Sequence, residues 1–289
     1  MFFKLIAVLA ISVSASQAPA TSELTLKGKV VLVTGSTDGL GREVARAVAS
    51  QGARVIVHGR NRERGEAVVQ EITREGKGTA RFYAADFASL AEVRTFAQSV
   101  LRDYDRLDML VNNAGVWIRD RQTSRDGHEL NLAVNYLAPF LLTRMLAPRL
   151  AASAPARIIN VASVAQTPID FDDLMLERPG RAAQGYGQSK LALIMFTMDL
   201  AAELKDRQVS VVAVHPATMM DTTMVRQTGM PARTTVDEGK AAVMNLIIGP
   251  VDTGQYYNGQ KPARANAQAY DEQARRKLRE ISLTLTSGK

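Results

Sequence analysis

The stretch KVVLVTGSTDGLG, residues 29–41, joins a short run of β-branched residues to a turn that contains three glycines. The helical pattern GREVARAVASQG begins at the last glycine of that turn. Glycine lets the backbone turn tightly and approach a pyrophosphate closely, and the positive end of the following helix favours its negative charge. Strand, glycine-rich turn and helix in this order predict a dinucleotide-binding site.

The same alternation of strand and helix continues along the chain. Runs that are apolar throughout are typical of parallel strands buried on both faces of a sheet. We therefore predict one α/β domain, residues 25–289, with a doubly wound Rossmann-type fold and a mostly parallel sheet of about seven strands flanked by helices. Further strands are expected at residues 53–59, 79–86, 107–115, 156–163 and 209–216, and helices at about 62–74, 90–104 and 127–150.

The residues that directly follow each strand form the candidate site, because such sheets bind ligands outside the carboxyl ends of their strands. Arg60 and Asn61 follow the second strand, where dinucleotide folds usually place an acid for the adenosine ribose. An arginine there suits a 2′-phosphate, and the alternative is a solvated residue at a helix start. An Asp at Gly59 is expected to shift the preference from NADPH toward NADH by like-charge repulsion.

Later strands are followed by further polar or small residues. Asp86 either accepts a hydrogen bond from the adenine amino group or caps the next helix, and the sequence leaves both open. The segment NNAG, residues 112–115, is small and polar where the chain would pass the cofactor. Ser163 follows the fifth strand, and YGQSK places Tyr186 and Lys190 one helical turn apart on the same helix face.

In this order and spacing the motifs resemble the classical short-chain dehydrogenase/reductase family, over about residues 26–260. TGSTDGLG resembles its TGxxxGxG turn and NNAG its sheet-stabilising motif. The resemblance implies four catalytic residues, Asn135, Ser163, Tyr186 and Lys190. The stretch IDFDDL and the arginine of HGRN further resemble a retinol-dehydrogenase-like branch that prefers NADP. In HPATMMD, however, Ala217 and Asp221 stand where the family usually has glycine and threonine.

The expected cofactor is NADP, with NADPH preferred over NADH, and no metal site is expected. Ser36 and Asn61 are each expected to add a hydrogen bond to the 2′-phosphate. The candidate cofactor-binding residues are Gly35, Ser36, Thr37, Asp38, Gly39, Leu40, Gly41, Arg60, Asn61, Asp86, Phe87, Asn113, Ala114, Gly115, Tyr186, Lys190, Pro216 and Thr218.

The implied activity is that of an NADPH-dependent carbonyl reductase or alcohol dehydrogenase. Tyr186 is expected to exchange a proton with the substrate oxygen, with its pKa lowered by the ammonium of Lys190. Ser163 would orient the substrate, and Asn135 would hold a water that connects Lys190 to solvent. Lys190 would also hold the nicotinamide ribose. A dinucleotide sensor or scaffold without turnover is the alternative, and a sugar-nucleotide epimerase is disfavoured by the short C-terminal region.

The substrate pocket is expected from residues 164–184 and 217–235. Four methionines in the second segment would suit an apolar ketone, aldehyde or alcohol, because methionine adapts to irregular apolar shapes. The alternative is that they only pack a lid helix. They are Met219, Met220, Met224 and Met230.

Composition limits the partners. The net charge is +7, but charges of both signs are mixed in RNRERGE and ARRKLRE, so no nucleic-acid-binding stripe is predicted. The absence of cysteine excludes disulfides and thiolate catalysis, and the three histidines lack metal-ligand spacing. A small-molecule substrate is therefore the expected partner, and a homo-oligomer is left open.

The first twenty residues, MFFKLIAVLAISVSASQAPA, have the layout of a secretory signal peptide. A membrane tether and a start codon assigned too early are the alternatives, since the apolar run is short for a membrane span. NADPH is a cytosolic cofactor and no twin-arginine signal is present. We expect an enzyme that faces the cytoplasm, in contact with membrane only through residues 1–20, with export as the alternative.

Overall fold

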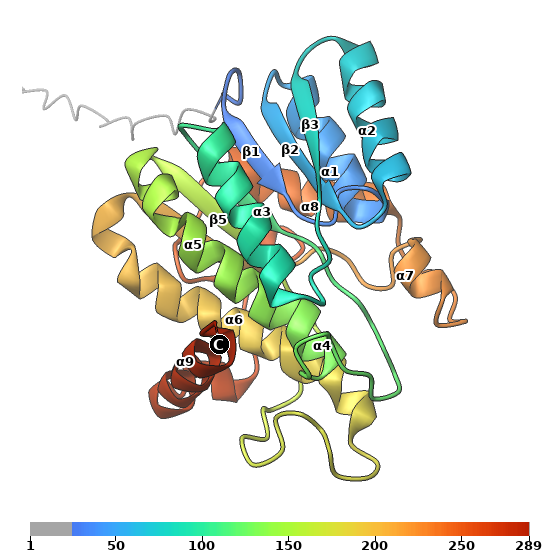
Figure 1. The fold of residues 1–289 in the computed structure, drawn as a ribbon, viewed down its shortest axis with the longest axis vertical. Coiled ribbons are helices and arrows are strands. Elements are labelled where there is room, and N and C mark those ends of the chain that lie inside the picture. The colour runs from blue at the N-terminus through green and yellow to red at the C-terminus, as the bar shows by residue number, and fades with distance from the viewer. Residues whose placement is uncertain (1–24, 289) are drawn as a thin grey trace, which may run out of the picture.

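The structure, a computed structural model, describes residues 25–288, so the signal-like segment lies outside the described residues. Its centre is an eight-stranded sheet in the order β3-β2-β1-β4-β5-β6-β7-β8 (Figure 1). All neighbouring strands are parallel except β7 and β8. The strands are β1 (Val30–Val33), β2 (Arg54–Gly59), β3 (Thr79–Ala84), β4 (Met109–Asn112), β5 (Ala156–Val161), β6 (Val209–His215), β7 (Tyr256–Asn258) and β8 (Lys261–Ala263).

Helices cover both faces of this sheet, which confirms the doubly wound prediction (Figure 1). One face carries α1 (Gly39–Ser50), α2 (Arg62–Glu75) and α8 (Val236–Ile248). The other carries α3 (Leu90–Asp103), α5 (Ala138–Ala152) and α6 (Gly185–Glu203), with α9 (Glu272–Thr286) packed outside α6. Two short helices, α4 (Leu130–Leu132) and α7 (Thr223–Arg226), lie near the site.

The strands form because their apolar residues are buried between these two helix layers. Every residue of β1, β4 and β5 is buried, as the continuous apolar runs predict. The order of winding reverses at β1, which lies between β2 and β4. A crevice outside the carboxyl ends of β1 and β4 is therefore the expected ligand site.

The long central helix begins at Leu130 and not at the predicted residue 127. The carboxylate of Glu129 caps it by accepting hydrogen bonds from the backbone N–H groups of Asn131 (3.0 Å) and Leu132 (2.7 Å). Its segment Ala133–Leu137 is π-helical, a form often found at functional sites. By length and composition alone, residues 130–152 could span a membrane, but 78% of the apolar window is buried inside the domain.

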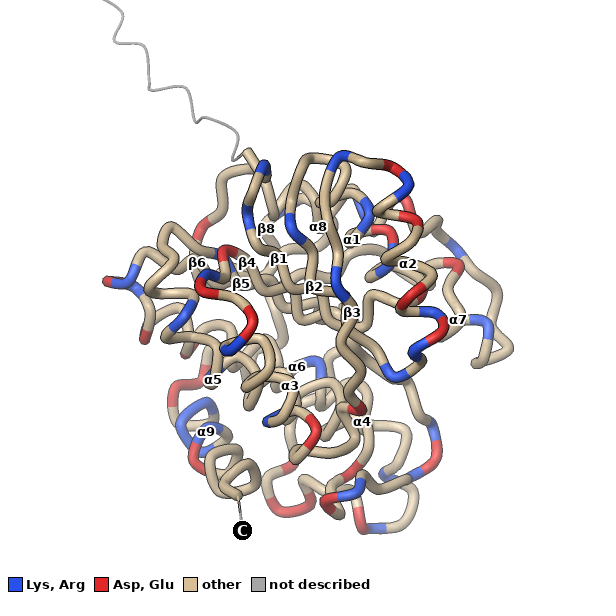
Figure 2. Tube along the Cα trace, turned by 45° about the horizontal axis from the view of Figure 1, so that its top comes forward, with Lys and Arg blue, Asp and Glu red and all other residues tan. Residues whose placement is uncertain are grey.

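Charged residues of both signs are interleaved along the helices. Figure 2 shows this around α1 and α2, where Arg42 pairs with Glu71 at 2.7 Å and Arg46 with Glu75 at 2.6 Å. These partly exposed pairs neutralise one another locally, in line with the solvated helix faces predicted from the sequence.

Candidate active site

The glycine-rich turn after β1 is built as its sequence predicts. Gly35 and Gly39 have positive φ angles of 63° and 51°, which favour glycine. A Cβ atom on Gly35 would lie 2.8 Å from the Cα atom of Ala114, and one on Gly41 would lie 2.3 Å from the Gly35 carbonyl oxygen. The turn is therefore closed against NNAG and leads directly into α1.

Three hydrogen bonds fasten this turn to the end of β2. Ser36 donates its N–H to the carbonyl of His58 (2.9 Å) and accepts the N–H of His58 on its hydroxyl (3.0 Å). Gly35 donates its N–H to Nδ1 of His58 at 3.1 Å. Since Ser36 is fully buried and its hydroxyl also donates to Val33, it cannot bind the 2′-phosphate, and that expectation is wrong.

His58 was not predicted to have any role. Its ring stacks between Phe87 and Phe96, at 4.3 and 4.7 Å between ring centroids. Burial lowers the pKa of His58 to about 3, so the imidazole is neutral. Phe87, a candidate cofactor contact, thus supports the turn from inside the core with its side chain.

Asp38 caps α1 by accepting the N–H of Gly39 at 2.7 Å. Its other oxygen accepts the Thr223 hydroxyl (2.7 Å) and lies 3.6 Å from Arg64. Arg64, which sequence reasoning missed, lines with Thr37 and Asp38 a cleft of about 270 Å³ between the N-terminal end of α1 and the side of α2. The sequence did contain a signal for Arg64. Arg60 lies just before α2 and Arg64 lies in its first turn, four residues later.

The end of β2 explains the missing acid. A Cβ atom on Gly59 would lie 2.5 Å from the Thr37 methyl group, so Thr37 occupies the space of a side chain there. An Asp at this position would therefore collide with Thr37. The expected switch toward NADH considered only charge repulsion and not this collision.

Arg60 is exposed, and it forms no ion pair with any residue in the described part of the chain. The carbonyl oxygen of the Asn61 side chain caps α2 through the Arg64 N–H (2.9 Å), which leaves the Asn61 amino group for a ligand.

Asp86 does not cap the next helix. The cap of α3 is Ser89, whose hydroxyl accepts the N–H of Glu92 at 3.3 Å. Asp86 instead accepts the N–H of Ala88 at 3.0 Å and lies 3.8 Å from Arg125. Of the two roles expected for Asp86, the helix cap is ruled out, and the hydrogen bond to the adenine amino group stays a prediction.

NNAG joins β4 to the glycine-rich turn. The amide of Asn113 donates to the carbonyl oxygens of Thr34 (2.9 Å) and Gly35 (3.2 Å). Asn112 bonds across the sheet to Asn160 at 2.8 Å, consistent with a sheet-stabilising motif. Gly115 passes so close to the catalytic candidates that an added Cβ atom would lie 3.5 Å from Nζ of Lys190.

The structure brings Ser163, Tyr186 and Lys190 together outside the carboxyl end of β5. Tyr186 lies in the first turn of α6, where burial raises its pKa and a hydrogen bond with Ser163 partly lowers it. The Lys190 ammonium donates to the carbonyl of Val161 at 2.8 Å and lies 5.8 Å from the Tyr186 ring centroid. Burial lowers the pKa of Lys190 to about 8.

Burial alone raises the pKa of Tyr186, because loss of water disfavours the phenolate, and Lys190 donates to the Val161 carbonyl and not to the phenol. The hydrogen bond from Ser163 opposes this effect only in part. The expected lowering of this pKa, by Lys190 together with the nicotinamide charge, stays a prediction.

The fourth candidate, Asn135, uses its whole side-chain amide as a brace. Its oxygen accepts the N–H of Val116 (2.8 Å), and its nitrogen donates to the Val116 carbonyl and the Ser189 hydroxyl, both at 2.9 Å. Ser189 in turn donates to the Tyr186 carbonyl at 2.7 Å. Asn135 thereby links the segment after β4 to the first turn of the catalytic helix.

Past β6, Pro216 is buried and Thr218 is exposed. The hydroxyl of Thr218 lies 2.9 Å from Nε2 of His215. Burial and, secondarily, the nearby charge of Lys190 lower the pKa of His215 to about 4, so this imidazole is also neutral. These residues place the end of β6 beside the catalytic cluster.

The methionines of the loop after β6 have different surroundings. Met220 packs against the apolar cluster under α1 and α8, so its role is packing, the alternative to lining a substrate pocket. Met224 in α7 reaches the catalytic end, with its methyl carbon 3.8 Å from where a Cβ atom on Gly115 would lie. Met230 is 36% exposed. Met224 is thus in position to line a substrate site near the reacting atoms.

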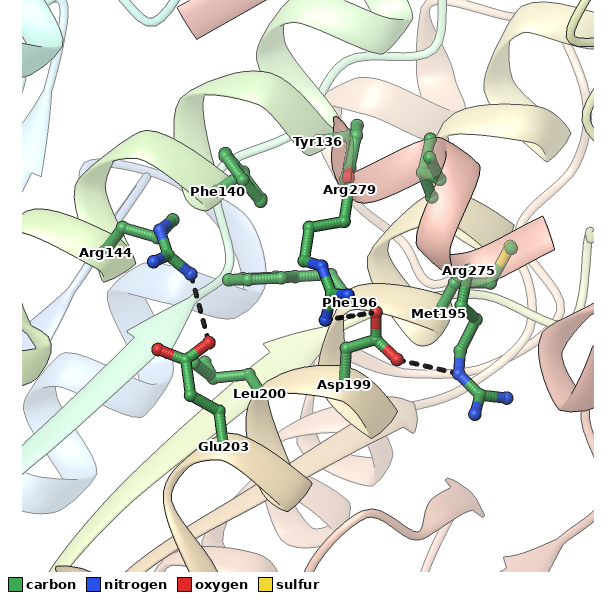
Figure 3. Close-up of a pocket in the computed structure, with 11 residues that line it drawn as sticks. Tyr136, Phe140, Arg144, Met195, Phe196, Asp199, Leu200, Glu203, Arg275 and Arg279 are labelled. Atoms are coloured by element: carbon green, nitrogen blue, oxygen red, sulfur yellow. Dashed lines mark hydrogen bonds and ion pairs between the residues drawn. The ribbon is translucent and has the colours of Figure 1, made fainter. Parts of the chain in front are cut away.

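A separate hollow between α5, α6 and α9 contains none of these catalytic side chains (Figure 3). There Asp199 pairs with Arg275 at 2.8 Å and with Arg279 at 3.6 Å, while Arg144 pairs with Glu203 at 3.1 Å. The paired charges hold α9 against α6, and the hollow is a seam between helices. In residues 25–288, no group of three His, Asp or Glu side chains could hold a metal ion.

The fold and this cluster define an NAD(P)-binding oxidoreductase that acts on CH–OH or C=O groups. A sequence model of the short chain dehydrogenase family matches residues 29–232. The chain therefore belongs to the short-chain dehydrogenase/reductase family, and its relatives place it with the retinol-dehydrogenase-like members.

Two curated relatives carry that placement. The chain is 34% identical to human retinol dehydrogenase 13, over 89% of this chain and 84% of that protein. It is 41% identical to human retinol dehydrogenase 11, over 69% of this chain and 64% of that protein.

Solved structures of the family include complexes with either dinucleotide. A short chain dehydrogenase from Burkholderia cenocepacia in complex with NADP is 28% identical, with a TM-score of 0.66, over 81% of this chain and 97% of that one. A 3-ketoacyl-(acyl-carrier-protein) reductase from Brucella melitensis complexed with NADH is 27% identical, with a TM-score of 0.64 and the same coverage.

Proposed function

We propose that this protein is an NADP(H)-dependent carbonyl reductase or alcohol dehydrogenase for an apolar ketone, aldehyde or alcohol. The observation that carries the proposal is the convergence of Ser163, Tyr186 and Lys190 outside β5, with Ser163 close enough to lower the pKa of the phenol and the ammonium 5.8 Å from the centroid of its ring. A protein that only bound a dinucleotide would require the glycine-rich turn alone. The candidate residues keep their proposed roles, except that Ser36 does not bind the 2′-phosphate and the side-chain amide of Asn135 is already engaged by Val116 and Ser189.

The chain offers a fitting path for a dinucleotide. The turn presents the N-terminus of α1 outside β1, and Gly115 passes beside Lys190 without a side chain to block a nicotinamide. Because Asp38 already caps α1, a pyrophosphate would use N–H groups that Asp38 leaves free. When bound, the cofactor supplies or accepts the hydride.

The chain's own residues would handle the proton. In reduction, Tyr186 would give its phenolic proton to the oxygen that becomes an alkoxide, and Ser163 would donate a hydrogen bond to the same oxygen. Lys190 would leave the Val161 carbonyl to hold the nicotinamide ribose, which moves its charge toward the phenol and favours the phenolate. Protons would pass between Lys190 and solvent through the π-helical turn around Asn135. The side-chain amide of Asn135 itself is engaged by Val116 and Ser189.

A preference for NADPH is supported by Arg60, Asn61 and the added Arg64. The acid that would repel a 2′-phosphate is absent, and Thr37 fills its place beside Gly59. A guanidinium binds phosphate through charge-assisted and often bidentate hydrogen bonds. Arg64 already interacts with an anionic oxygen of Asp38, so its side chain can reach the same cleft.

The test is a steady-state assay with NADPH and NADH over aliphatic, aromatic and steroid-like carbonyls. Turnover that requires Tyr186 and is faster with NADPH supports the proposal. Saturable NADPH binding without turnover of any carbonyl would favour a dinucleotide sensor instead.

We also propose that the working enzyme faces the cytoplasm and that residues 1–20 are dispensable for folding and activity. The proposal rests on the supply of NADPH in the cytosol. Fractionation and N-terminal sequencing of the active protein test it, and a wholly exported protein cleaved after about Ala20 contradicts it.

A further inference from the structure

Trp117 is the single tryptophan of the chain, and its indole stacks on the ring of Tyr186. The ring centroids lie 5.2 Å apart with 28° between the planes. Trp117 is only partly buried, so one side of the indole covers the catalytic phenol while part of it stays accessible. An aromatic surface therefore lies directly beside the proposed acid.

Two asparagine side chains hold the backbone on either side of this indole. The amide of Asn135 pairs with both the N–H (2.8 Å) and the carbonyl (2.9 Å) of Val116. The amide of Asn131 pairs in the same way with the N–H and the carbonyl of Ile118, both at 2.9 Å. Trp117 thus lies between two cyclic amide–backbone pairs.

These two clamps are themselves fixed. Asn131 and Asn135 are one helical turn apart and fully buried. The amide of Asn131 also donates to the buried carboxylate of Glu129 at 2.8 Å, and that of Asn135 to Ser189 at 2.9 Å. Since an unpaired buried amide is costly, loss of either clamp would be resisted by the surrounding core. The backbone on both sides of Trp117 is therefore fixed, and the indole stacks on the Tyr186 ring, before any substrate binds.

Apolar residues lie close in sequence to the catalytic residues and to Trp117. Val164, 46% exposed, directly follows Ser163. Met224 reaches toward Gly115, which is two residues before Trp117. Ile118, partly exposed, follows Trp117. A substrate whose oxygen reaches Tyr186 and Ser163 would carry its adjacent atoms past these groups.

We propose that Trp117 is a specificity-determining residue that contacts the substrate and selects carbonyls and alcohols attached to a flat aromatic or conjugated group. The inference rests on the proposed function and names the substrate class of the same site. A flat group can lie against the indole over its whole area, whereas a puckered saturated ring of equal carbon number contacts it at a few atoms. Stacking of a substrate ring on the indole should raise its affinity about 2- to 13-fold over that of a substrate without such a ring.

The experiment compares benzaldehyde with cyclohexanecarbaldehyde, using NADPH as cofactor, in wild type, Trp117→Phe, Trp117→Leu and Asn131→Leu. The ratio of the two kcat/KM values is compared among variants, because intrinsic reactivity then cancels. Trp117→Leu should lower the ratio about three- to tenfold, mainly through the KM of benzaldehyde, while Trp117→Phe should keep most of it. Asn131→Leu should lower it less, by freeing the indole. Val164→Ala is the matched control, since it removes apolar contact for both substrates alike.

An unchanged ratio in Trp117→Leu overturns the inference while leaving the proposed function intact. Absence of turnover with every carbonyl contradicts the proposed function instead, and the inference is then tested by binding. In that case the fluorescence of Trp117 reports ligands directly, because no other tryptophan contributes. Saturable quenching by benzyl alcohol at concentrations about threefold or more below those required for cyclohexylmethanol supports the inference, and equal titration of the two alcohols overturns it.

Discussion

The two ends of the proposed cofactor path are built differently. At the catalytic end, Asn135, Ser189 and Lys190 are buried and bonded to one another or to backbone carbonyls. At the phosphate end, Arg60 is exposed, and the side chains of Arg64 and Asp38 are 61% and 45% exposed. Water can replace a lost partner at the exposed end but not at the buried one. Substitutions should therefore have larger effects near Tyr186 than near Arg60.

The largest effect is expected from Tyr186→Phe. The substitution removes only the phenolic proton, so kcat should fall at least about 100-fold, within the usual range for general acid catalysis. NADPH affinity, measured by its fluorescence, should stay within about twofold because the ring and Lys190 are kept. Retention of more than a tenth of the wild-type kcat would rule out Tyr186 as the proton donor.

The next effect concerns acid stability at the turn. His58 is neutral when folded, with a pKa of about 3, but its ordinary pKa is 6.5. Protonation therefore favours unfolding: the cost is absent above about pH 6.5 and grows by about 1.4 kcal/mol per pH unit as the pH falls toward 3. His215, with a pKa of about 4, should add a similar slope down to that pH.

His58→Asn separates the two histidines, because an Asn oxygen can accept the Gly35 N–H in place of Nδ1 and does not titrate. Denaturant unfolding from pH 7 to 5 should show a shallower loss of stability in this variant than in wild type. Parallel pH profiles would mean that His58 is not buried and neutral as the structure shows.

Arg60→Ala should have an intermediate effect at the exposed end. A charge-assisted hydrogen bond contributes about 1.5–3 kcal/mol, so kcat/KM for NADPH should fall about 10- to 150-fold and that for NADH should barely change. Arg64→Ala is the matched comparison, since Arg64 is another exposed arginine near the start of α2 and lines the cleft beside Thr37 and Asp38. An unchanged NADPH/NADH ratio in Arg60→Ala would show that Arg60 is a solvated residue at a helix start.

The smallest effect should come from Thr223→Val, which removes the hydrogen bond between α7 and Asp38. One such bond is worth about 0.5–1.5 kcal/mol, so amide hydrogen exchange in residues 222–229 should speed up about two- to tenfold. Thr223→Ser keeps the hydroxyl and should exchange at the wild-type rate. Equal exchange in the Val and Ser variants would indicate that this bond does not hold the loop.

The parts of the fold that sequence predicted are those with a local signal. Continuous apolar runs identified β1, β4 and β5. Helical spacing placed Tyr186 and Lys190 on one face, and the resemblance to the family implied that Ser163 joins them in one cluster. The three-residue strands β7 and β8 gave no comparable signal, since each is short and is held by pairing across the sheet.

The details of the site were less accessible for a related reason. The role of His58 depends on Phe87 and Phe96, and the clamp on Ile118 depends on the start of a helix that the sequence placed three residues early. The burial of Ser36 depends on its pairing with β2. Each feature arises from residues far apart in the chain, so no local pattern indicates it.

The packing of Thr37 against Gly59 constrains how this enzyme could evolve a different cofactor choice. An acidic residue introduced first at Gly59 would bring its Cβ atom to 2.5 Å from the Thr37 methyl group, so that intermediate is strained before any benefit appears. A lineage that first reduces Thr37 to alanine or glycine opens the space at little cost, and the acid can then follow. We therefore expect the two positions to be epistatic, with an acid at Gly59 tolerated only after Thr37 has been reduced in size.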